Sequence, residues 1–354
     1  MGEVRLLKSP ELGLTDEIQP FEDGLRTEER SGSYEWWYFD SKYADGSSLV
    51  IIFYTKPVTS FAKAFKPFVS LNYIHPNGKE IRTTFESNDY TFSKDTCDIR
   101  IGECYIRGDL KHYEIYFKNK DAECRLTLTG SVPSWRPDSG HIYFGKKDFF
   151  AWLPSVPEGI VSGTLTTGGE TIALSGTGYH DHNWGNKLMI LLMNDWYWGR
   201  AKIGDYVVVS SYIYAPKKDG YKATPVFMLA KDGKLLTGDA FKHLKYEEKD
   251  FIKDPYTKRH VAKTLVYDYN DPEKGIHYRI TYKKGNEDVE RQVMTDIVGR
   301  PLAIMFYLLG FRGSYHRMGG TVILERFDND KIVEQIEAPA MWEQMCFKPD
   351  RVKQ

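Results

Sequence analysis

Residues capable of acid–base chemistry are concentrated in one short segment near the middle of the chain. The stretch from Gly176 to Gly185 reads Gly-Thr-Gly-Tyr-His-Asp-His-Asn-Trp-Gly, and ten residues later the stretch from Asp195 to Arg200 reads Asp-Trp-Tyr-Trp-Gly-Arg. Histidine titrates near neutral pH, and aromatic rings commonly line the pockets that hold small molecules. This region is therefore the leading candidate for an active or binding site.

The pair His180 and His182 allows three interpretations. Two imidazoles at this spacing could bind one metal ion, although no Glu or His stands nearby at a spacing typical of a third metal ligand. They could also be buried structural histidines that hydrogen bond the backbone or Asp181. The third interpretation, which we favour, is acid–base catalysis, since burial can raise the pKa of a nearby carboxyl into a useful range.

Strand geometry predicts which of these side chains lie together, because successive residues of an extended strand face opposite sides of the sheet. The face expected to point inward, because it is apolar at its start, carries Ile172, Leu174, His180, His182 and Trp184. The opposite face carries Tyr179, Asp181 and Asn183. This prediction requires the strand to continue unbroken through its glycines.

The elements that must position this segment are predicted to be strands. Short apolar or alternating runs are separated by turn dipeptides such as Asn77-Gly78 and Asp232-Gly233, which is typical of β-hairpins. Amphipathic helices with recognisable caps are scarce. The sequence therefore predicts an all-β fold.

A coarse internal repeat divides the chain in two. The tetrad Glu35-Trp36-Trp37-Tyr38 is followed by a turn and an apolar strand. A similar tetrad, Asp195-Trp196-Tyr197-Trp198, is also followed by a turn and an apolar strand. We therefore expect two similar β domains, one at 1–190 that includes a leader at 1–34, and one at 191–354.

Composition excludes several classes of protein. The 354 residues carry a formal net charge of -1, and basic and acidic residues are interspersed. The sequence therefore shows no cluster of positive charge that would bind the phosphate backbone of a nucleic acid. The four cysteines lack metal-binding or disulfide-scaffold spacing, and the first residues lack an apolar signal-peptide core, so we expect a cytoplasmic protein. Motifs for nucleotides, flavins and zinc proteases are missing.

An uncharged apolar run extends from Pro301 to Phe311 between Arg300 and Arg312. It is too short to span a bilayer. One interpretation is a buried strand or helix. The other is a surface segment that contacts a membrane peripherally and through which a lipophilic substrate enters. Oligomeric state is not predictable from the sequence.

The aromatic tetrads also have two interpretations. Trp36, Trp37, Trp196 and Trp198 could close the ends of two barrels, and Arg200 could pack across one of these rings. Inside a pocket, the same rings could stack on a polyene and stabilise developing positive charge through their faces.

Three motifs carry a resemblance to a known family: the segments 33–40, 179–185 and 196–200. They resemble the signatures of the hydroxyneurosporene synthase (carotenoid 1,2-hydratase) and lipocalin-like family, which also includes fungal decalin-forming Diels-Alderases. The resemblance covers nearly the whole chain. It implies two lipocalin-like β-barrel or β-sandwich domains packed side by side, a hydrophobic pocket near their junction, and no cofactor; the residues themselves give us no reason to expect a metal.

The resemblance implies an enzyme that acts on the C=C bonds of a small hydrophobic isoprenoid or polyene, as a lyase or an isomerase. Hydratases of the family protonate an alkene and add water, whereas its pericyclases fold a linear polyene into a reactive conformer. In the hydratases a Tyr and an Asp join a His–Trp pair, but here the corresponding strand offers Tyr212 and Tyr214 and no carboxylate. A non-catalytic carrier of a hydrophobic ligand is the alternative.

Each candidate residue receives an expected role. Asp181 is the expected general acid, and His182 is expected to tune it or hold water. The expected catalytic residues are Asp181, His182, His180 and Tyr212. The expected substrate-binding residues are Trp184, Trp196, Trp198, Trp37, Tyr214, Asn183, Glu35 and Arg200.

Overall fold

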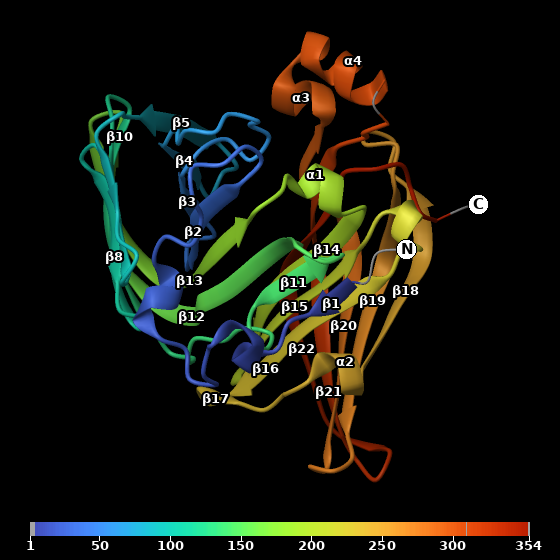
Figure 1. Ribbon diagram of the computed structural model, residues 1–354. Coiled ribbons are helices and arrows are strands. Elements are labelled where there is room, and N and C mark those ends of the chain that lie inside the picture. Colours follow the sequence, from blue (N-terminus) through green and yellow to red (C-terminus); the bar gives the residue numbers. More distant parts are fainter. Residues whose placement is uncertain (1–3, 309, 353–354) are drawn as a thin grey trace. The chain divides into compact units, whose positions relative to one another are not determined.

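The computed structural model, which describes residues 4–308 and 310–352, confirms the all-β prediction (Figure 1). The chain divides into two compact units. One consists of Leu6–Tyr143 and Lys147–Leu188, and we call it the first unit. The second unit holds most of the chain from Met189 onward, together with Phe144–Lys146 and the start of the chain.

A sheet of 13 strands contains nearly all the strands of the first unit, in the order β5-β4-β3-β2-β13-β12-β10-β9-β8-β7-β6, with β11 beside β12 and β1 beside β11. Its strands are β1 (Val4–Leu6), β2 (Tyr34–Tyr43), β3 (Ser48–Tyr54), β4 (Phe68–Ile74), β5 (Glu80–Glu86), β6 (Tyr90–Phe92), β7 (Cys97–Ile101), β8 (Cys104–Gly108), β9 (His112–Lys118), β10 (Ala122–Gly130), β11 (His141–Phe144), β12 (Asp148–Thr167) and β13 (Glu170–Gly185).

This sheet curls round an apolar core. In Figure 1, β2–β5 (blue) lie across from β8 and β10 (teal to green), and buried side chains from both groups form one cluster. In β3 and β4, buried residues alternate with half-buried ones, as the pleat requires. The amide of Asn119 donates to the hydroxyl of Thr83 at 2.7 Å, which ties the β9–β10 turn to β5.

The second unit contains a sheet of nine strands in the order β17-β16-β15-β14-β22-β21-β20-β19-β18. Its strands are β14 (Asp195–Ile203), β15 (Tyr206–Tyr214), β16 (Ala223–Lys231), β17 (Lys234–Leu235), β18 (Leu244–Lys253), β19 (His260–Asp271), β20 (Ile276–Val293), β21 (Ser314–Asp328) and β22 (Lys331–Cys346). The described helices are short: α1 (Met189–Leu192), α2 (Ala240–His243), α3 (Met294–Val298) and α4 (Arg300–Leu308). Tyrosines dominate the core, including Tyr197, Tyr267, Tyr269 and Tyr282.

Strand β13 is the central element for the candidate site. It runs unbroken from Glu170 to Gly185 between β2 and β12. Its glycines are places of close approach: a Cβ on Gly176 would lie 2.1 Å from the carbonyl oxygen of Lys42, and one on Gly178 would lie 2.5 Å from Val161. Glycine at these positions therefore allows the strand to stay paired on both edges.

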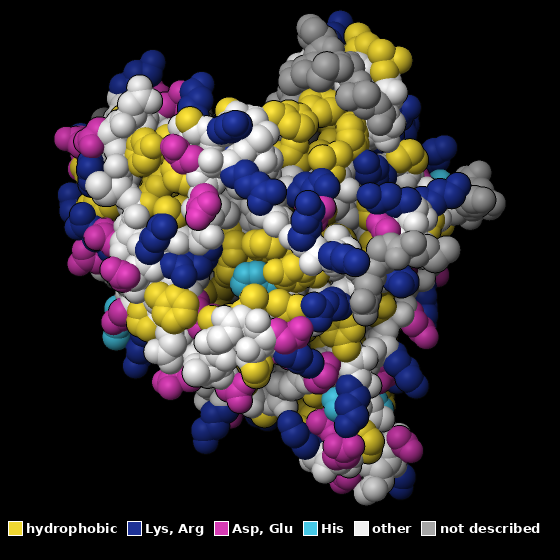
Figure 2. Space-filling model, in the orientation of Figure 1, with side chains coloured by type: hydrophobic (Ala, Val, Ile, Leu, Met, Phe, Trp, Pro, Cys, Tyr) yellow, Lys and Arg dark blue, Asp and Glu magenta, His cyan; other side chains and the backbone are white. Residues whose placement is uncertain are grey.

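The apolar run at 301–311 contains a helix, α4, rather than a strand. Ala303 and Phe306 are buried, whereas Ile304 is 59% and Leu308 is 84% exposed. The side chains of Pro301, Leu302, Met305 and Leu309 lie outside the described residues. Among the described helices, none combines the length and apolar character needed to cross a bilayer. On the face drawn in Figure 2, both signs of charge are scattered, as the sequence suggested.

We expect Gly176→Ala to destabilise the first unit by about 1–3 kcal/mol, because the added methyl group collides with backbone that cannot move without breaking the β2–β13 pairing. Urea unfolding monitored by circular dichroism measures the change. Gly238→Ala is the matched control, since the nearest atom to its added Cβ is 3.6 Å away. Equal stability of the two variants would contradict the close-approach role.

Candidate functional site

The two histidines of the central motif lie on the predicted inward face of β13. His180 stands in register with Phe39 of β2, His182 with Trp37, and Trp184 with Glu35. Both histidines are 0% exposed. The predicted alternation of faces is therefore observed.

His180 is held between two groups that only accept hydrogen bonds. Its Nδ1 donates to the carbonyl oxygen of Tyr38 at 2.8 Å, and its Nε2 donates to Asp23 Oδ2 at 3.2 Å. Burial alone would lower the pKa of His180, but the charge of Asp23 and both hydrogen bonds raise it above its ordinary value. Burial would raise the pKa of Asp23, but His180, His182 and the Tyr113 hydroxyl lower it. The pair is therefore an imidazolium beside a carboxylate.

His182 repeats this arrangement one step along the strand. Its Nδ1 lies 3.1 Å from the carbonyl oxygen of Glu22, and its Nε2 lies 2.8 Å from Glu35 Oε1. The Glu35 carboxylate also accepts from the amides of Arg26 and Thr27, at 2.7 Å each. These bonds fasten residues 22–27 to the inward face of the sheet.

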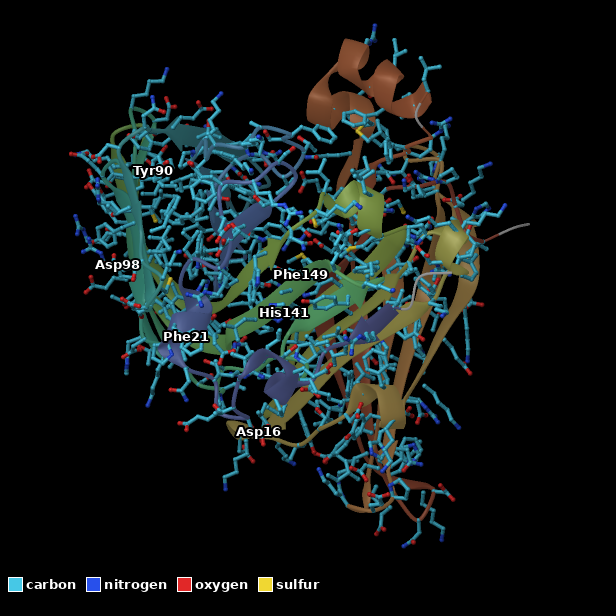
Figure 3. The ribbon with its side chains drawn as sticks, viewed as in Figure 1. Asp16, Phe21, Tyr90, Asp98, His141 and Phe149 are labelled. Atoms are coloured by element: carbon cyan, nitrogen blue, oxygen red, sulfur yellow. The ribbon has the colours of Figure 1, made fainter. Side chains whose placement is uncertain are left out.

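The fastened segment begins at the end of a short 3₁₀ helix, Pro20–Asp23, whose Phe21 is labelled in Figure 3. A further buried pair holds it: Arg136 Nε lies 2.6 Å from Glu22 Oε2, and both side chains are at most 5% exposed. Arg136 also donates to the carbonyl oxygen of Thr15 at 2.7 Å. This inward cluster thus resembles the structural interpretation in that both histidines are buried beside backbone carbonyls, but their side-chain partners are Asp23 and Glu35 rather than Asp181.

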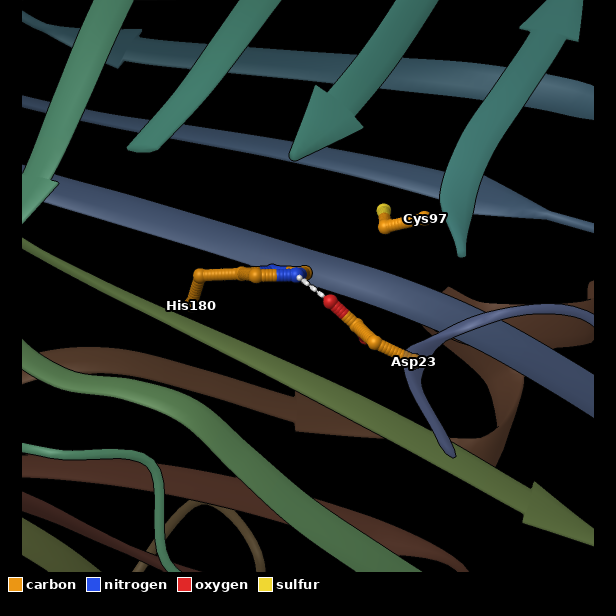
Figure 4. A group of neighbouring side chains, drawn as sticks. All are labelled: Asp23, Cys97 and His180. Atoms are coloured by element: carbon orange, nitrogen blue, oxygen red, sulfur yellow. Dashed lines mark hydrogen bonds and ion pairs between the residues drawn. The ribbon is translucent and has the colours of Figure 1, made fainter. Parts of the chain in front are cut away.

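One part of this cluster has the composition of a metal site: Asp23, Cys97 and His180, whose ligand atoms lie within 4.8 Å of one another (Figure 4). A metal would need a thiolate and a neutral imidazole nitrogen. Burial and the neighbouring Asp23 raise the pKa of the Cys97 thiol well above its ordinary value, and His180 Nε2 is already bonded to Asp23. The three residues therefore fit a metal ion poorly.

A second such group in the second unit consists of Asp254, Asp288 and His316. Here the cations are already supplied by the protein. Arg291 Nη1 lies 3.2 Å from Asp254 and 3.3 Å from Asp288, and Lys284 Nζ lies 2.8 Å from Asp288. This group is an internal salt-bridge network.

Asp181 lies on the opposite face of β13, as predicted, and receives three hydrogen bonds. Trp152 Nε1 and the Tyr179 hydroxyl donate to Oδ2 at 2.7 Å each, and Asn183 Nδ2 donates to Oδ1 at 2.6 Å. Burial raises the pKa of Asp181 to about 6, although these three donors and His180 act to lower it. The result is a buried carboxyl that exchanges its proton near neutral pH.

Aromatic rings surround this carboxyl. Tyr38 stands in register with Asp181 and Trp36 with Asn183, and both rings are half-buried. Tyr179 lies edge-on to Tyr38, with ring centroids 6.2 Å apart. We call Asp181, Asn183, Tyr179, Trp152, Tyr38 and Trp36 the Asp181 cluster.

His182 and Asp181 lie on opposite faces of β13, because adjacent residues of a pleated strand point to opposite sides of the sheet. Burial raises the pKa of Asp181, and the three neutral donors together with the charge of His180 lower it. The sequence reasoning missed Trp152 as a partner; the signal for it is the β12–β13 register, in which Trp152 pairs with Asn183.

In the second unit, the predicted residues also separate by face. Trp196, Trp198 and Arg200 alternate with Tyr197 along β14, and Tyr212 stands in register with Tyr197. Tyr212 and Tyr214 therefore share the face of the tyrosine core, away from the two tryptophans.

Each tyrosine has a defined partner there. Tyr212 stacks on Tyr246 with ring centroids 4.0 Å apart. Tyr214 donates to Glu248 at 2.9 Å, and the guanidinium of Arg351 lies over its ring at 3.5 Å.

Comparison with known proteins agrees with the motifs. Residues 30–288 match the model of the Diels-Alderase-like family. A protein named hydroxyneurosporene dehydrogenase, from Chlorobaculum tepidum, is 28% identical over 218 residues, which cover 48% of this chain and 54% of that protein. A quinolone epoxide rearrangement protein from Penicillium thymicola is 29% identical over 73 residues, or 21% of this chain and 19% of that protein. The chain thus matches about half, or less, of these relatives.

Solved structures share the fold. CghA with Sch210972 superposes with a TM-score of 0.63 at 13% identity, over 90% of this chain and 89% of that one. Kievitone hydratase from Nectria haematococca superposes with a TM-score of 0.54 at 11% identity, over 89% of each chain. The resemblance to the hydratase and Diels-Alderase family, and the lipocalin-like all-β fold class, are confirmed.

The raised pKa of Asp181 predicts a pH-dependent stability. Between about pH 4 and pH 6 the folded state binds this proton and the unfolded state releases it, so the unfolding free energy falls by up to about 3 kcal/mol as pH rises through that range. Asp181→Asn should remove this contribution. Urea unfolding of the unmodified protein and of Asp181→Asn across this pH range measures the difference between their unfolding free energies. Contributions from the other titratable groups cancel in that difference.

Asp16→Asn is the control for this experiment, because Asp16 is exposed (Figure 3). It should leave the pH dependence unchanged. A slope for Asp181→Asn equal to that of the unmodified protein would show that Asp181 titrates as it does in the unfolded chain.

Proposed function

The chain belongs to the Diels-Alderase-like family, and we propose that it is a cofactor-independent enzyme that acts on a C=C bond of a lipophilic isoprenoid or polyene. Two of the similar proteins are named for reactions of small organic molecules, a quinolone epoxide rearrangement and the hydration of kievitone. The observation that carries the proposal for this chain is the Asp181 cluster.

Asp181 serves as the general acid in this proposal. With a pKa of about 6, roughly a tenth of the molecules carry its proton at neutral pH. Oδ2 already accepts two hydrogen bonds and Oδ1 accepts one, so Oδ1 is the oxygen that we assign to carry the proton. The aromatic neighbours make the site suitable for an apolar substrate.

In the hydration route, Asp181 gives one proton to the substrate and regains one from the added water. Asp181 transfers its proton to one alkene carbon, and the other carbon becomes a cation. The half-buried rings of Tyr38 and Trp36 offer π-faces to that cation. Water adds to the cation and returns a proton to the carboxylate, which Trp152, Tyr179 and Asn183 stabilise in the meantime.

A pericyclase is the second candidate, and the saturation of Asp181 by donors favours it. A carboxyl held by three neighbours is a rigid anchor, and a pericyclic reaction needs a fixed conformation with one or two hydrogen bonds to a carbonyl. In this version protonated Asp181 donates to the substrate carbonyl and no proton moves to carbon.

A non-catalytic carrier is the third alternative. A pure carrier gains little from a buried carboxyl, because burying a polar group costs free energy unless it is satisfied. The inward residues His180, His182, Glu35 and Trp37 are assigned to anchoring the leader in this proposal rather than to substrate.

We expect Asp181→Asn to lower the rate of a hydration reaction by about 10²–10⁴-fold while the protein stays folded, since the amide cannot give up a proton. Purified protein is incubated in D₂O with a panel of linear isoprenoids and polyenes, and products are identified by mass spectrometry. Hydration by the unmodified enzyme places one solvent deuterium on carbon.

Three outcomes separate the candidates. A cyclised isomer without carbon-bound deuterium, formed at similar rates by both proteins, would favour the pericyclase. An unchanged copurified lipid after long incubation would favour the carrier. Full hydration activity of Asp181→Asn would eliminate Asp181 as the acid.

For a lipophilic substrate we also propose peripheral membrane contact through α4, whose Ile304 and Leu308 are exposed beside Arg300. Ile304→Ser with Leu308→Ser should weaken sedimentation with anionic phospholipid vesicles several-fold, because each change removes exposed apolar area. The control is Ile332→Ser with Val333→Ser, at residues that are 49% and 47% exposed. Equal binding of both double variants would contradict the contact.

A further inference from the structure

A row of aromatic rings runs along the inward face of β13 and continues beyond it. Neighbouring centroids are separated by 4.7 Å, 4.6 Å, 5.3 Å, 5.1 Å and 5.5 Å along the series Trp37, His182, Trp184, His141, Phe149 and Tyr143. Its first members are buried, and its last three are half-buried. The row therefore leads from the core to accessible side chains.

His141 is the polar member at the accessible end. Its Nδ1 lies 2.9 Å from the carbonyl oxygen of Ser139, which can only accept a hydrogen bond. Nδ1 therefore carries the hydrogen of the neutral ring, and Nε2 carries the lone pair. Within the described part of the chain, no hydrogen bond reaches Nε2.

The ring is uncharged at neutral pH. Burial lowers the pKa of His141 to about 4, the charge of Arg136 lowers it further, and the bond to Ser139 opposes both effects. An uncharged imidazole with an open Nε2 is a good hydrogen-bond acceptor. It is a poor partner for anions, because it offers them no second N–H.

The surroundings of His141 are apolar. Phe149 and Ile18 pack against the small buried cluster of Ala151, Leu153 and Trp184. Figure 2 shows a histidine recessed among hydrophobic side chains, at the place where Figure 3 labels His141 beside Phe149. His141 is half-buried, and its Nε2 is not among the buried side-chain atoms that lack a partner, so a donor group from outside can reach this nitrogen.

We propose that the recess at His141 binds a planar, apolar molecule through an O–H or N–H group that donates to Nε2. The flanking rings of Trp184 and Phe149 supply flat apolar faces for stacking. This site lies on the other face of the β12–β13 pair from Asp181, so it stands apart from the acid chemistry proposed there. Its ligand class is an aromatic or conjugated molecule that carries a phenol, enol or ring N–H.

The probes are 2-naphthol and 2-methoxynaphthalene, which have similar shape and differ in the donor. By isothermal titration calorimetry at neutral pH, we expect the unmodified protein to bind 2-naphthol about tenfold more tightly. His141→Phe keeps an aromatic ring and removes the acceptor, so it should bind both probes equally. His112→Phe, at an exposed histidine, and Asp181→Asn should keep the preference.

Equal affinities for the two probes in the unmodified protein would overturn the proposal, as would a preference that survives in folded His141→Phe. If that variant does not fold, ¹⁵N NMR of the unmodified protein tests whether 2-naphthol donates a hydrogen bond to His141 Nε2. Addition of 2-naphthol should shift His141 Nε2 toward a hydrogen-bonded value and leave Nδ1 unchanged. An unmoved Nε2 signal at saturating 2-naphthol would also overturn it.

Discussion

The alternation of side chains along β13 is the constraint on which the rest of the first unit depends. Because the strand is hydrogen bonded to β2 on one edge and to β12 on the other, it cannot rotate to offer both kinds of residue to one face. His180 and His182 must therefore enter the interior when Asp181 faces the other way. A slip of one residue would place Asp181 beside the carboxylates of Asp23 and Glu35 and would move both imidazoles away from them.

The interior tolerates two histidines only because the leader brings partners to them. Each ring has one nitrogen within hydrogen-bonding distance of a carbonyl oxygen and the other within that distance of a carboxylate oxygen, so every ring nitrogen has a partner. Asp23 and Glu22 reach this position from a segment that precedes the first long strand. The leader is thus part of the fold, and removing the Asp23 carboxylate would leave the buried His180 imidazolium unpaired.

The sequence was sufficient to predict the fold class and the two faces of β13, because both follow from local periodicity. The partners across the sheet were not accessible in the same way. Trp152 reaches Asp181 through a strand register that includes bulges near Val156. Asp23 and His180 are 157 positions apart in the sequence. The apolar run was ambiguous because length and composition fit a helix or a strand equally well, and it contains helix α4.

Two buried aspartates show how the same burial gives opposite chemistry. Asp23 is 1% exposed and Asp181 is 5% exposed, so both lose nearly all contact with water. Asp23 faces the imidazolium of His180 and keeps a lowered pKa, whereas Asp181 is held by neutral donors and has its pKa raised to about 6. A cation compensates a buried carboxylate more strongly than neutral hydrogen bonds do. The motif therefore places its fixed ion pair inside and the carboxyl with the raised pKa on the other face, which is why we assign the general-acid role to Asp181 and not to the histidines beside it in sequence.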